Sequence, residues 1–469
     1  MLLRHNVVKN EFINEAKEKK IVCYGAGKVF KDFLQLYSML NVSAVIDKKL
    51  SKEENISNSF EIPIISLEDF FNICDNKTIL IITCFDYQQV EEELNAYSQL
   101  KDLSCYVYCL IEGAFGIKDD GRISDKYEIA EFKMQDYNAG QKAPSDVAII
   151  AAEAGYKLLT VNRGTYRYGT EQTKSEWDRV CNEIFNNSTI LIQLPLVDVS
   201  GGIYKLIELK KDKNIKVIAV VHDIEILRNN VTDNFIEQYN MLKTCADIWI
   251  VHNERMKEAL ISRGFDAERI VSLQIFDYLI TNPIDVKSDE GVIIAGNLDI
   301  DKSGYIYKLK QIKGVKFNLF GANYSDNNVY NNINYFGAFL PEELIKNLQG
   351  KYGLVWDGDS LDTCSGLTGE YLKVNNPHKL SLYLAVGLPV IIWDEAAEAE
   401  FVKCENVGLT VSSLYELPDK LADVSYSDYA IMKTNADKIG KRLRNGEYMT
   451  RALKNAEVKI KEIELDDGL

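Results

Sequence analysis

A polar segment ahead of a long apolar stretch has the residue types of an anion-binding site. Asn375, Asn376, Pro377, His378 and Lys379 stand where a helix is expected to begin. Free backbone N–H groups and the positive end of a helix dipole favour an anion at such a place. Lys379 adds a full positive charge, and Pro377 fits a first helical turn because no N–H bond is lost there. The segment predicts a diphosphate site; the alternative is an ordinary strand–loop–helix connection with a long loop.

A histidine and an aspartate, His222 and Asp223, directly follow the strand expected at Lys216–Val221. Ligands of open parallel sheets bind beyond the carboxyl ends of the strands. The pair is therefore the best candidate for a general base that takes a proton from an attacking hydroxyl group. The alternative is structural: Asp223 caps the following helix and His222 orients a neighbouring loop.

The elements that must position these residues form an α/β fold, because strands and helices alternate almost throughout. The first unit has a Rossmann-type opening, with Gly25 and Gly27 after an apolar strand and Asp47 about 20 residues later. Phe30 stands in place of the third glycine of that motif. This favours a degenerate domain used for packing or partner contact over a nucleotide-sensing or oxidoreductase domain.

Composition narrows the class of protein further. A chain of 469 residues is expected to form two to four domains. Its formal net charge of −16 argues against a nucleic-acid partner, although a local basic patch could still contact a membrane. No apolar run approaches the ~20 residues that span a bilayer, and the N-terminus lacks the apolar core of a signal peptide. Nine scattered cysteines without a CxxC pair favour reduced thiols in the cytoplasm.

Three sequence words, GLVWDGDS, GEYLKVNNPHKLSLYLAVGLPVIIW and VVHDIEILR, resemble bacterial sugar transferases of the galactofuranosyltransferase and glucosyltransferase-3-like families. The resemblance covers roughly Lys133 to Lys459. It implies the GT-B fold, in which two Rossmann-like domains face each other, and a UDP-sugar as donor. The domains expected on this basis are an extra Rossmann-like domain at 1–125, an acceptor-side domain at 133–285, a donor-binding domain at 286–435, and C-terminal helices at 436–469 that cross back to the acceptor side.

The resemblance also assigns the donor side. Lys379 and the amides of the following helix meet the diphosphate without a metal ion, so no cofactor is expected. Gly337 and Phe339 line a uracil pocket. The expected donor-binding residues are Gly296, Asn297, Lys302, Gly337, Phe339, Asp357, Asn375, Asn376, His378, Lys379 and Ser381.

Asp357 and Asp359 also resemble the DxD motif that holds Mn²⁺ or Mg²⁺ in transferases of another fold. Their place in the third unit of the chain favours binding of sugar hydroxyls or ordering of the loop instead. Lys302 is equally well explained as a solvated surface lysine.

Two loops after strands are candidates for acceptor contact. Tyr166 and Arg167 can stack on a sugar face and pair with an anionic lipid carrier, and Gly201 and Gly202 can let the chain approach a ligand closely. Both loops are also explained as ordinary loop residues.

Within the resembled group, the segment WDGDSLDTCSGLTGEYLKVNNPHK is closer to the galactofuranosyltransferases, and the resemblance therefore implies an inverting transferase of galactofuranose. The acceptor is a saccharide or a lipid-linked glycan, and the protein is cytoplasmic. Peripheral contact with the membrane and assembly into a homo-oligomer both remain open. The alternatives are a glucosyltransferase that acts on a glycosylated protein and a non-catalytic partner subunit.

Overall fold

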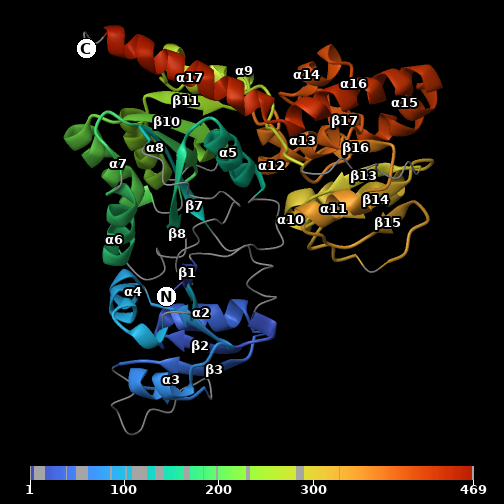
Figure 1. Ribbon diagram of the computed structural model, residues 1–469. Coiled ribbons are helices and arrows are strands. Elements are labelled where there is room, and N and C mark those ends of the chain that lie inside the picture. Colours follow the sequence, from blue (N-terminus) through green and yellow to red (C-terminus); the bar gives the residue numbers. More distant parts are fainter. Residues whose placement is uncertain are drawn as a thin grey trace.

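The computed structural model of the chain describes residues 2–4, 16–38, 40–48, 62–84, 87–100, 103–107, 124–132, 142–162, 170–182, 184–196, 199–228, 233–280, 290–326 and 328–466. These residues form three sheets of six strands each, in which neighbouring strands pair in parallel (Figure 1). Each sheet lies in its own stretch of the chain. The predicted α/β fold of Rossmann-like parts is confirmed.

The N-terminal sheet has the strand order β1-β6-β5-β2-β3-β4. Its strands are β1 (Leu2–Arg4), β2 (Lys20–Tyr24), β3 (Val42–Ile46), β4 (Ile64–Ile65), β5 (Thr78–Ile82) and β6 (Ser104–Val107). Its helices are α2 (Lys28–Leu36), α3 (Leu67–Ile73), α4 (Tyr87–Asn95) and η2 (Ser98–Leu100).

The glycine turn of this sheet is occupied by the protein's own groups. Gly25 has φ +100°, and a Cβ there would lie 2.2 Å from the sulfur of Cys84, so a side chain is excluded. The amide of Ala26 donates to the carboxylate of Asp47 at 3.1 Å. Phe30 is buried in the core. A dinucleotide motif also requires a tight turn at its first glycine, so only the buried Phe30 and the occupied Asp47 carboxylate favour the degenerate-domain hypothesis.

The middle region (residues 124–280) contains a sheet of order β12-β11-β10-β9-β7-β8. Its strands are β7 (Lys126–Phe132), β8 (Lys157–Asn162), β9 (Thr189–Leu194), β10 (Lys216–Val221), β11 (Ile248–Val251) and β12 (Ile270–Ser272). Its helices are α5 (Lys142–Glu153), α6 (Thr170–Cys181), α7 (Val199–Lys213), η5 (Glu225–Leu227), α8 (Asp233–Cys245), α9 (Glu254–Ile261) and η6 (Ala267–Arg269).

Strand β7 differs from the expected domain boundary. The polar segment Lys118–Lys133 is predicted to be the junction between the first two domains, yet Lys126–Phe132 within it forms a strand that pairs with both β8 and β9. Tyr127 and Ile129 are buried on one face, and Glu128 between them is also buried. In the sequence of this strand, charged residues alternate with apolar ones, which is the pattern of a strand with one exposed face. The pattern therefore did not predict an inner strand that is buried on both faces.

The C-terminal region (residues 290–446) contains a sheet of order β15-β14-β13-β16-β17-β18. Its strands are β13 (Val292–Ala295), β14 (Phe317–Phe320), β15 (Ile333–Tyr335), β16 (Tyr352–Val355), β17 (Val390–Trp393) and β18 (Gly408–Val411). Its helices are α10 (Ile300–Ser303), η7 (Gly304–Gln311), α11 (Pro341–Asn347), α12 (Gly366–Tyr371), α13 (His378–Ala385), α14 (Ala399–Cys404), η8 (Leu414–Glu416), α15 (Leu417–Asp423) and α16 (Tyr426–Arg444). The strand order reverses between β13 and β16, which is where ligands of such sheets bind.

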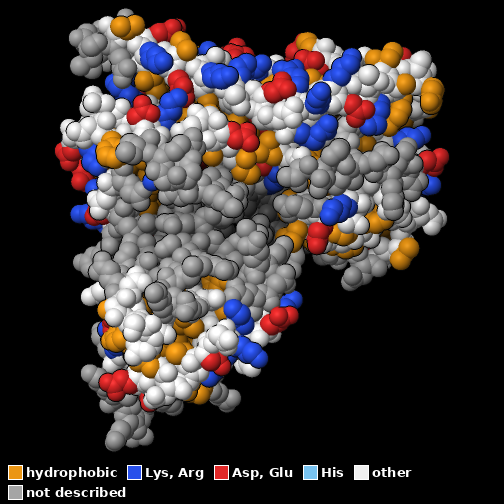
Figure 2. All heavy atoms as spheres, in the orientation of Figure 1, with side chains coloured by type: hydrophobic (Ala, Val, Ile, Leu, Met, Phe, Trp, Pro, Cys, Tyr) orange, Lys and Arg blue, Asp and Glu red, His pale blue; other side chains and the backbone are white. Residues whose placement is uncertain are grey.

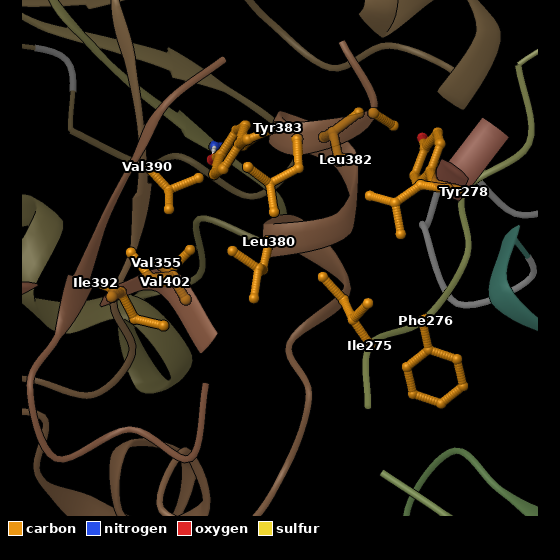
Figure 3. Close-up of a cluster of buried hydrophobic side chains, with 14 of the residues drawn as sticks. Ile275, Phe276, Tyr278, Val355, Leu380, Leu382, Tyr383, Val390, Ile392 and Val402 are labelled. Atoms are coloured by element: carbon orange, nitrogen blue, oxygen red, sulfur yellow. Dashed lines mark hydrogen bonds between the residues drawn. The ribbon is translucent and has the colours of Figure 1, made fainter. Parts of the chain in front are cut away.

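Helix α13 is almost completely buried. Every residue from Leu380 to Ala385 is buried. Figure 3 shows Leu380, Leu382 and Tyr383 between two layers: Ile275, Phe276 and Tyr278 on one side, and Val355, Val390 and Ile392 of the sheet on the other. The helix therefore joins the C-terminal sheet to the linker that arrives from the middle region.

Two chain segments cross between the middle and C-terminal regions. The first is the linker of residues 273–280, and the second follows α16, where α17 (Glu447–Asp466) begins and packs on β11, β12 and α5 (Figure 1). The expected return of the C-terminal helices thus begins at Glu447, later than position 436. The carboxylate of Asp277 accepts from the amides of Tyr448 at 3.2 Å and Met449 at 2.6 Å, which ties the two crossings together.

None of the described helices is both long and apolar enough to cross a membrane. On the face shown in Figure 2, lysine and arginine side chains are interspersed with aspartate and glutamate along the surface at the top, where α17 lies. Among the described residues of this face, no extended patch of one charge is visible.

We expect Asp277→Ala to destabilise the protein by about 1–3 kcal/mol, because two amides of the α17 N-terminus lose a buried acceptor. The measurement is the free energy of unfolding from urea titration. Asp266→Ala is the control, since Asp266 caps η6 with a carboxylate that is 57% exposed. Equal effects of the two substitutions would contradict the role given to Asp277.

Candidate functional site

The N-terminus of α13 brings a lysine to the strand-order switch point of the C-terminal sheet. The Lys379 ammonium donates to the carbonyl oxygen of Trp356 at 3.0 Å and to the carboxylate of Asp357 at 2.8 Å. Both side chains of this ion pair are largely buried, 17% and 11% exposed. An anion that binds here must compete with Asp357 for the lysine.

The loop that carries Asp357 and Asp359 is held closely against itself. Gly358 has φ +101°, and a Cβ there would lie 2.2 Å from the carbonyl oxygen of Ser365. The carboxylate of Asp359 accepts from the Ser365 hydroxyl, and this bond holds the pKa of Asp359 below its ordinary value. The geometry supports the prediction that these aspartates order the loop. Within the described ranges, no group of three or more His, Cys, Asp or Glu side chains has a metal-binding arrangement.

Glycine turns follow the neighbouring strands β13, β14 and β15. Gly296, Gly321 and Gly337 all have positive φ. A Cβ on Gly321 would lie 1.7 Å from the carbonyl oxygen of Gly296, and the Gly321 amide donates to the carbonyl oxygen of Gly337 at 2.8 Å. The two predicted glycines, Gly296 and Gly337, and Gly321 between them thus form one continuous edge of backbone without side chains.

Aromatic and amide side chains support this edge. Phe339 packs beside Phe320, whose ring stacks on Phe336 at 4.7 Å. The Asn297 side-chain oxygen accepts from the amide of Asp299 and from the side-chain amide of Asn323. Asn297 therefore shapes the turn through its side chain.

Asp223 faces the C-terminal region and is paired with an arginine that sequence analysis missed. Its carboxylate accepts from Arg228 at 2.5 Å, and the guanidinium also pairs with Glu225 at 3.0 Å. Burial raises the pKa of Asp223 above its ordinary value, while the charges of Arg228 and of Lys302 from the C-terminal region pull it down. The side chain remains 42% exposed. A carboxylate with this access and a raised pKa can accept a proton.

A tyrosine of the C-terminal region completes this contact. The Tyr371 ring lies 4.6 Å from the Arg228 guanidinium, and its hydroxyl accepts from the amide of Ile224 at 3.1 Å. The positions of Ile224 and Arg228, which flank Asp223, are therefore set by contacts from both regions. Arg228 lies in the word VVHDIEILR and Tyr371 in the word GEYLKVNNPHKLSLYLAVGLPVIIW, but neither residue was among the predicted site residues.

Three of the four histidines lie around one phenylalanine of the linker. The centroid distances from the Phe276 ring are 5.3 Å to His222, 5.0 Å to His252 and 6.2 Å to His378. Burial lowers the pKa of His222 to about 4 and those of His252 and His378 to about 3. All three imidazoles are therefore neutral near pH 7. His222 lies at the expected place, but so low a pKa makes it a poor proton acceptor.

Two residues expected to bind the donor are occupied in structural contacts. The Asn376 side chain accepts from Asn253 at 2.6 Å and donates to the carbonyl oxygens of His252 and Gln274 at 2.8 and 3.1 Å. The Ser381 hydroxyl donates to the carbonyl oxygen of Phe276 at 2.7 Å and is buried. Both side chains tie the α13 segment to the middle region and its linker, so the structure gives them no free group for a ligand.

Two further residues of this segment, Asn375 and His378, are half-buried, and each has one fully buried polar atom. The side-chain oxygen of Asn375 and Nε2 of His378 have no hydrogen-bond partner among the described residues. Their predicted contact with the donor stays a prediction.

The expected acceptor residues have different outcomes. Tyr166 and Arg167 lie outside the described residues. Gly201 and Gly202 lie inside α7 instead of a loop, and a Cβ on Gly202 would lie 2.5 Å from the buried ring of Trp177. Gly202 is therefore a packing glycine between α7 and α6, and the expected ligand approach at this position is not supported.

The chain matches family models over most of the part described above. Residues 126–275 match the N-terminal domain of glucosyltransferase 3-like proteins, and residues 292–456 match the C-terminal domain of the same proteins. The first match begins at β7, in agreement with the sheet.

Curated relatives include two kinds of sugar transferase. The chain is 37% identical over 243 residues to the β-1,6-galactofuranosyltransferase WbbI of Escherichia coli (strain K12), which covers 51% of this chain and 70% of the relative. It is 22% identical over 325 residues to glucosyltransferase 3 of Streptococcus gordonii, covering 68% and 94%.

Solved structures with a similar course of the chain include sucrose-phosphate synthase from Thermosynechococcus elongatus (TM-score 0.48, 14% identity, 72% of this chain and 100% of that one). Anabaena HepE in complex with UDP is similar to the same degree (TM-score 0.49, 11% identity, 71% and 99%). The sequence matches are the stronger of the two kinds of likeness.

We expect acid to destabilise the protein through the three neutral imidazoles. Their pKa values are lowered in the folded state, so the stability they contribute is present above the ordinary pKa of about 6.5 and is lost as pH falls below it. Glu128 and Asp277, whose pKa values burial raises to about 8 and about 7, act in the opposite direction. The contribution of one imidazole is therefore isolated by comparing the unfolding free energies of the wild type and a histidine variant at each pH, because Glu128 and Asp277 affect both proteins equally.

When the pH falls from 6.5 to 4.5, the unfolding free energy of the wild type should decrease by about 2 kcal/mol more than that of His378→Phe. The reason is that the variant has one imidazole fewer to take up a proton on unfolding. Urea titrations of both proteins at the two pH values measure this. Parallel pH dependences would show that His378 is not held neutral by burial.

Proposed function

The chain belongs to the glucosyltransferase 3-like family and is a glycosyltransferase, and we propose that it transfers galactofuranose from UDP-galactofuranose to a hydroxyl of a surface polysaccharide or glycoconjugate, with inversion. The sugar is proposed from the 37% identity to a β-1,6-galactofuranosyltransferase. Two observations carry the mechanism: Lys379 lies beside Asp357 at the N-terminus of α13, and the Asp223 carboxylate of the middle region lies within the electrostatic influence of Lys302 from the C-terminal region.

The donor is proposed to place its diphosphate at the α13 N-terminus. The backbone dipole and the Lys379 ammonium both favour an anion there. Because Asp357 already holds Lys379 at 2.8 Å, the diphosphate takes over part of the lysine's hydrogen bonding when it binds. Lys302, exposed on α10, adds positive charge on the same side. These two lysines supply the charge that a metal ion supplies elsewhere, so we propose that the reaction is metal-independent.

The uracil ring is proposed to lie along the glycine edge of Gly296, Gly321 and Gly337. Bare backbone lets a planar base approach closely, and Phe339 borders the same turn. Backbone amides and carbonyls there can recognise the edge of a base without a dedicated side chain.

Asp223 is proposed as the general base. It accepts the proton of the acceptor hydroxyl while the oxygen attacks the anomeric carbon from the face opposite UDP, and the bond to the UDP oxygen breaks. Lys379 and the helix dipole stabilise the charge that develops on the leaving UDP. Arg228 fixes the Asp223 carboxylate, and His222 beside it binds a substrate hydroxyl as a neutral hydrogen-bonding group.

The donor site is tested by calorimetric titration with UDP. We expect Lys379→Met to weaken binding about 10- to 100-fold, because a charge-assisted hydrogen bond is worth about 1.5–3 kcal/mol. Since this variant leaves Asp357 buried and unpaired, the double variant Lys379→Met/Asp357→Asn is the matched control for folding. Wild-type affinity in the folded double variant would contradict the site, and loss of UDP binding on adding EDTA would contradict metal independence.

The catalytic role is tested with Asp223→Asn. We expect transfer to fall at least about 100-fold, as general-base catalysis contributes typically 10²–10⁴-fold, while UDP binding stays at the wild-type level. Donors are compared by product formation from UDP-galactofuranose, UDP-galactose and UDP-glucose. Preference for UDP-glucose would overturn the proposed sugar in favour of a glucosyltransferase, and no turnover with intact UDP binding would favour a partner subunit.

A further inference from the structure

A buried chain of polar side chains runs along one face of the middle sheet and ends at His222. Glu128 lies on β7, Gln193 on β9 and His222 directly after β10. Glu128 pairs in register with Leu191, and Val220 with Gln193, so side-chain alternation places all three polar residues on the same face. Buried polar groups nearly always have hydrogen-bond partners. Apolar residues surround this polar chain on the same face of the sheet, so packing alone does not explain why three polar residues stand there.

The orientation of the Gln193 amide follows from its partners. Its Nε2 donates to the carbonyl oxygen of Pro144 at 3.1 Å and to Oε1 of Glu128 at 2.5 Å. A carbonyl oxygen can only accept, so the amide nitrogen must lie on that side. The Gln193 oxygen therefore faces His222, 2.6 Å from its Nε2.

This orientation fixes the proton on the His222 ring. An amide oxygen can only accept, so Nε2 of His222 must carry the hydrogen, and Nδ1 of the neutral ring is left with its lone pair. The ring is also stacked on Phe276, with 13° between the planes. Nδ1 is buried and has no hydrogen-bond partner among the described residues.

The state of Glu128 suits this arrangement. Burial raises its pKa to about 8, so near pH 7 it is mainly a neutral acid. A neutral acid accepts from Gln193 without placing a negative charge close to the imidazole. A carboxylate there would favour the protonated ring, which has no lone pair on Nδ1.

We propose that Gln193, supported by Glu128 and the Pro144 carbonyl, is a positioning residue that holds His222 as the Nε2–H tautomer and makes Nδ1 the acceptor for a substrate hydroxyl. The tautomer is a property of the protein alone. Only its use, the hydroxyl contact, rests on the proposed function.

The tautomer is tested by NMR of the full-length, ligand-free protein labelled with ¹⁵N-histidine. The chain has four histidines, so His222→Gln assigns its signals by loss. We expect Nε2 protonated and Nδ1 unprotonated in the wild type and in Glu128→Gln, which keeps a neutral acceptor. Gln193→Leu should shift the proton or mix the tautomers.

Asp247→Asn is the structural control. Asp247 is a buried carboxylate near the other end of the same sheet, where it pairs with Lys210 at 2.6 Å. This variant should lower stability and leave the His222 signals unchanged. A protonated Nδ1 in the wild type, or unchanged signals in Gln193→Leu, would overturn the proposal whatever the enzyme's substrate.

Transfer kinetics test the use of the tautomer. We expect Gln193→Leu to lower kcat/KM about 3- to 10-fold, the size of one neutral hydrogen bond, and to have no further effect in a His222→Ala background. Equal effects of Gln193→Leu in both backgrounds would show that Gln193 acts through folding alone and would remove the hydroxyl contact. If no UDP-sugar is turned over, the proposed function fails and the NMR result still decides the tautomer.

Discussion

The burial of helix α13 is the constraint on which the rest of the structure depends. Its eight residues lie between the C-terminal sheet and the linker of residues 273–280, so they cannot move without disturbing both. This burial presents the Lys379 side chain to Asp357 at the end of β16. It also explains why Asn376 and Ser381, polar residues of the same segment, are used as ties to the middle region. Asn376 lies just before the helix and Ser381 lies within it, so the polar ties add direction to a surface that is otherwise apolar.

The sequence predicted the parts of the site that depend on local pattern. The strand–loop–helix around Lys379 and the strand end at His222 and Asp223 lie where expected, because apolar runs and the residues after them are neighbours in the chain. Contacts between distant segments left no such signal. Asp357 and Lys379 were both named, but their ion pair was not, and Tyr371 meets Arg228 only because two sheets face each other. Gly202 was misjudged since a glycine that admits a ligand and one that admits Trp177 look alike in sequence.

Charge is distributed unevenly between the interior and the boundary of the two regions. The interior groups near Phe276 are held neutral: three imidazoles with lowered pKa and Glu128 with a raised one. The groups at the boundary are paired or exposed charges, with Asp223 on Arg228 and Lys379 on Asp357. A negatively charged ligand therefore meets ion-paired side chains at the boundary and an uncharged support behind them. Electrostatic stabilisation is strongest when such a support does not have to reorganise.

The tie between Asp277 and α17 limits how the two regions can move. Both covalent crossings lie side by side and are hydrogen-bonded to each other. Two adjacent connections favour a rotation about the line on which they lie, because translation would break the Asp277 bonds. Such a rotation must also release the bonds of Tyr371 to Ile224 and of Asn376 to Asn253. Opening to admit a donor or release a product is then a change of angle, and its amplitude grows with distance from that axis. On such a rotation the His222 end of the middle sheet, next to the linker, would move least, and the outer glycine edge at β15 would move furthest.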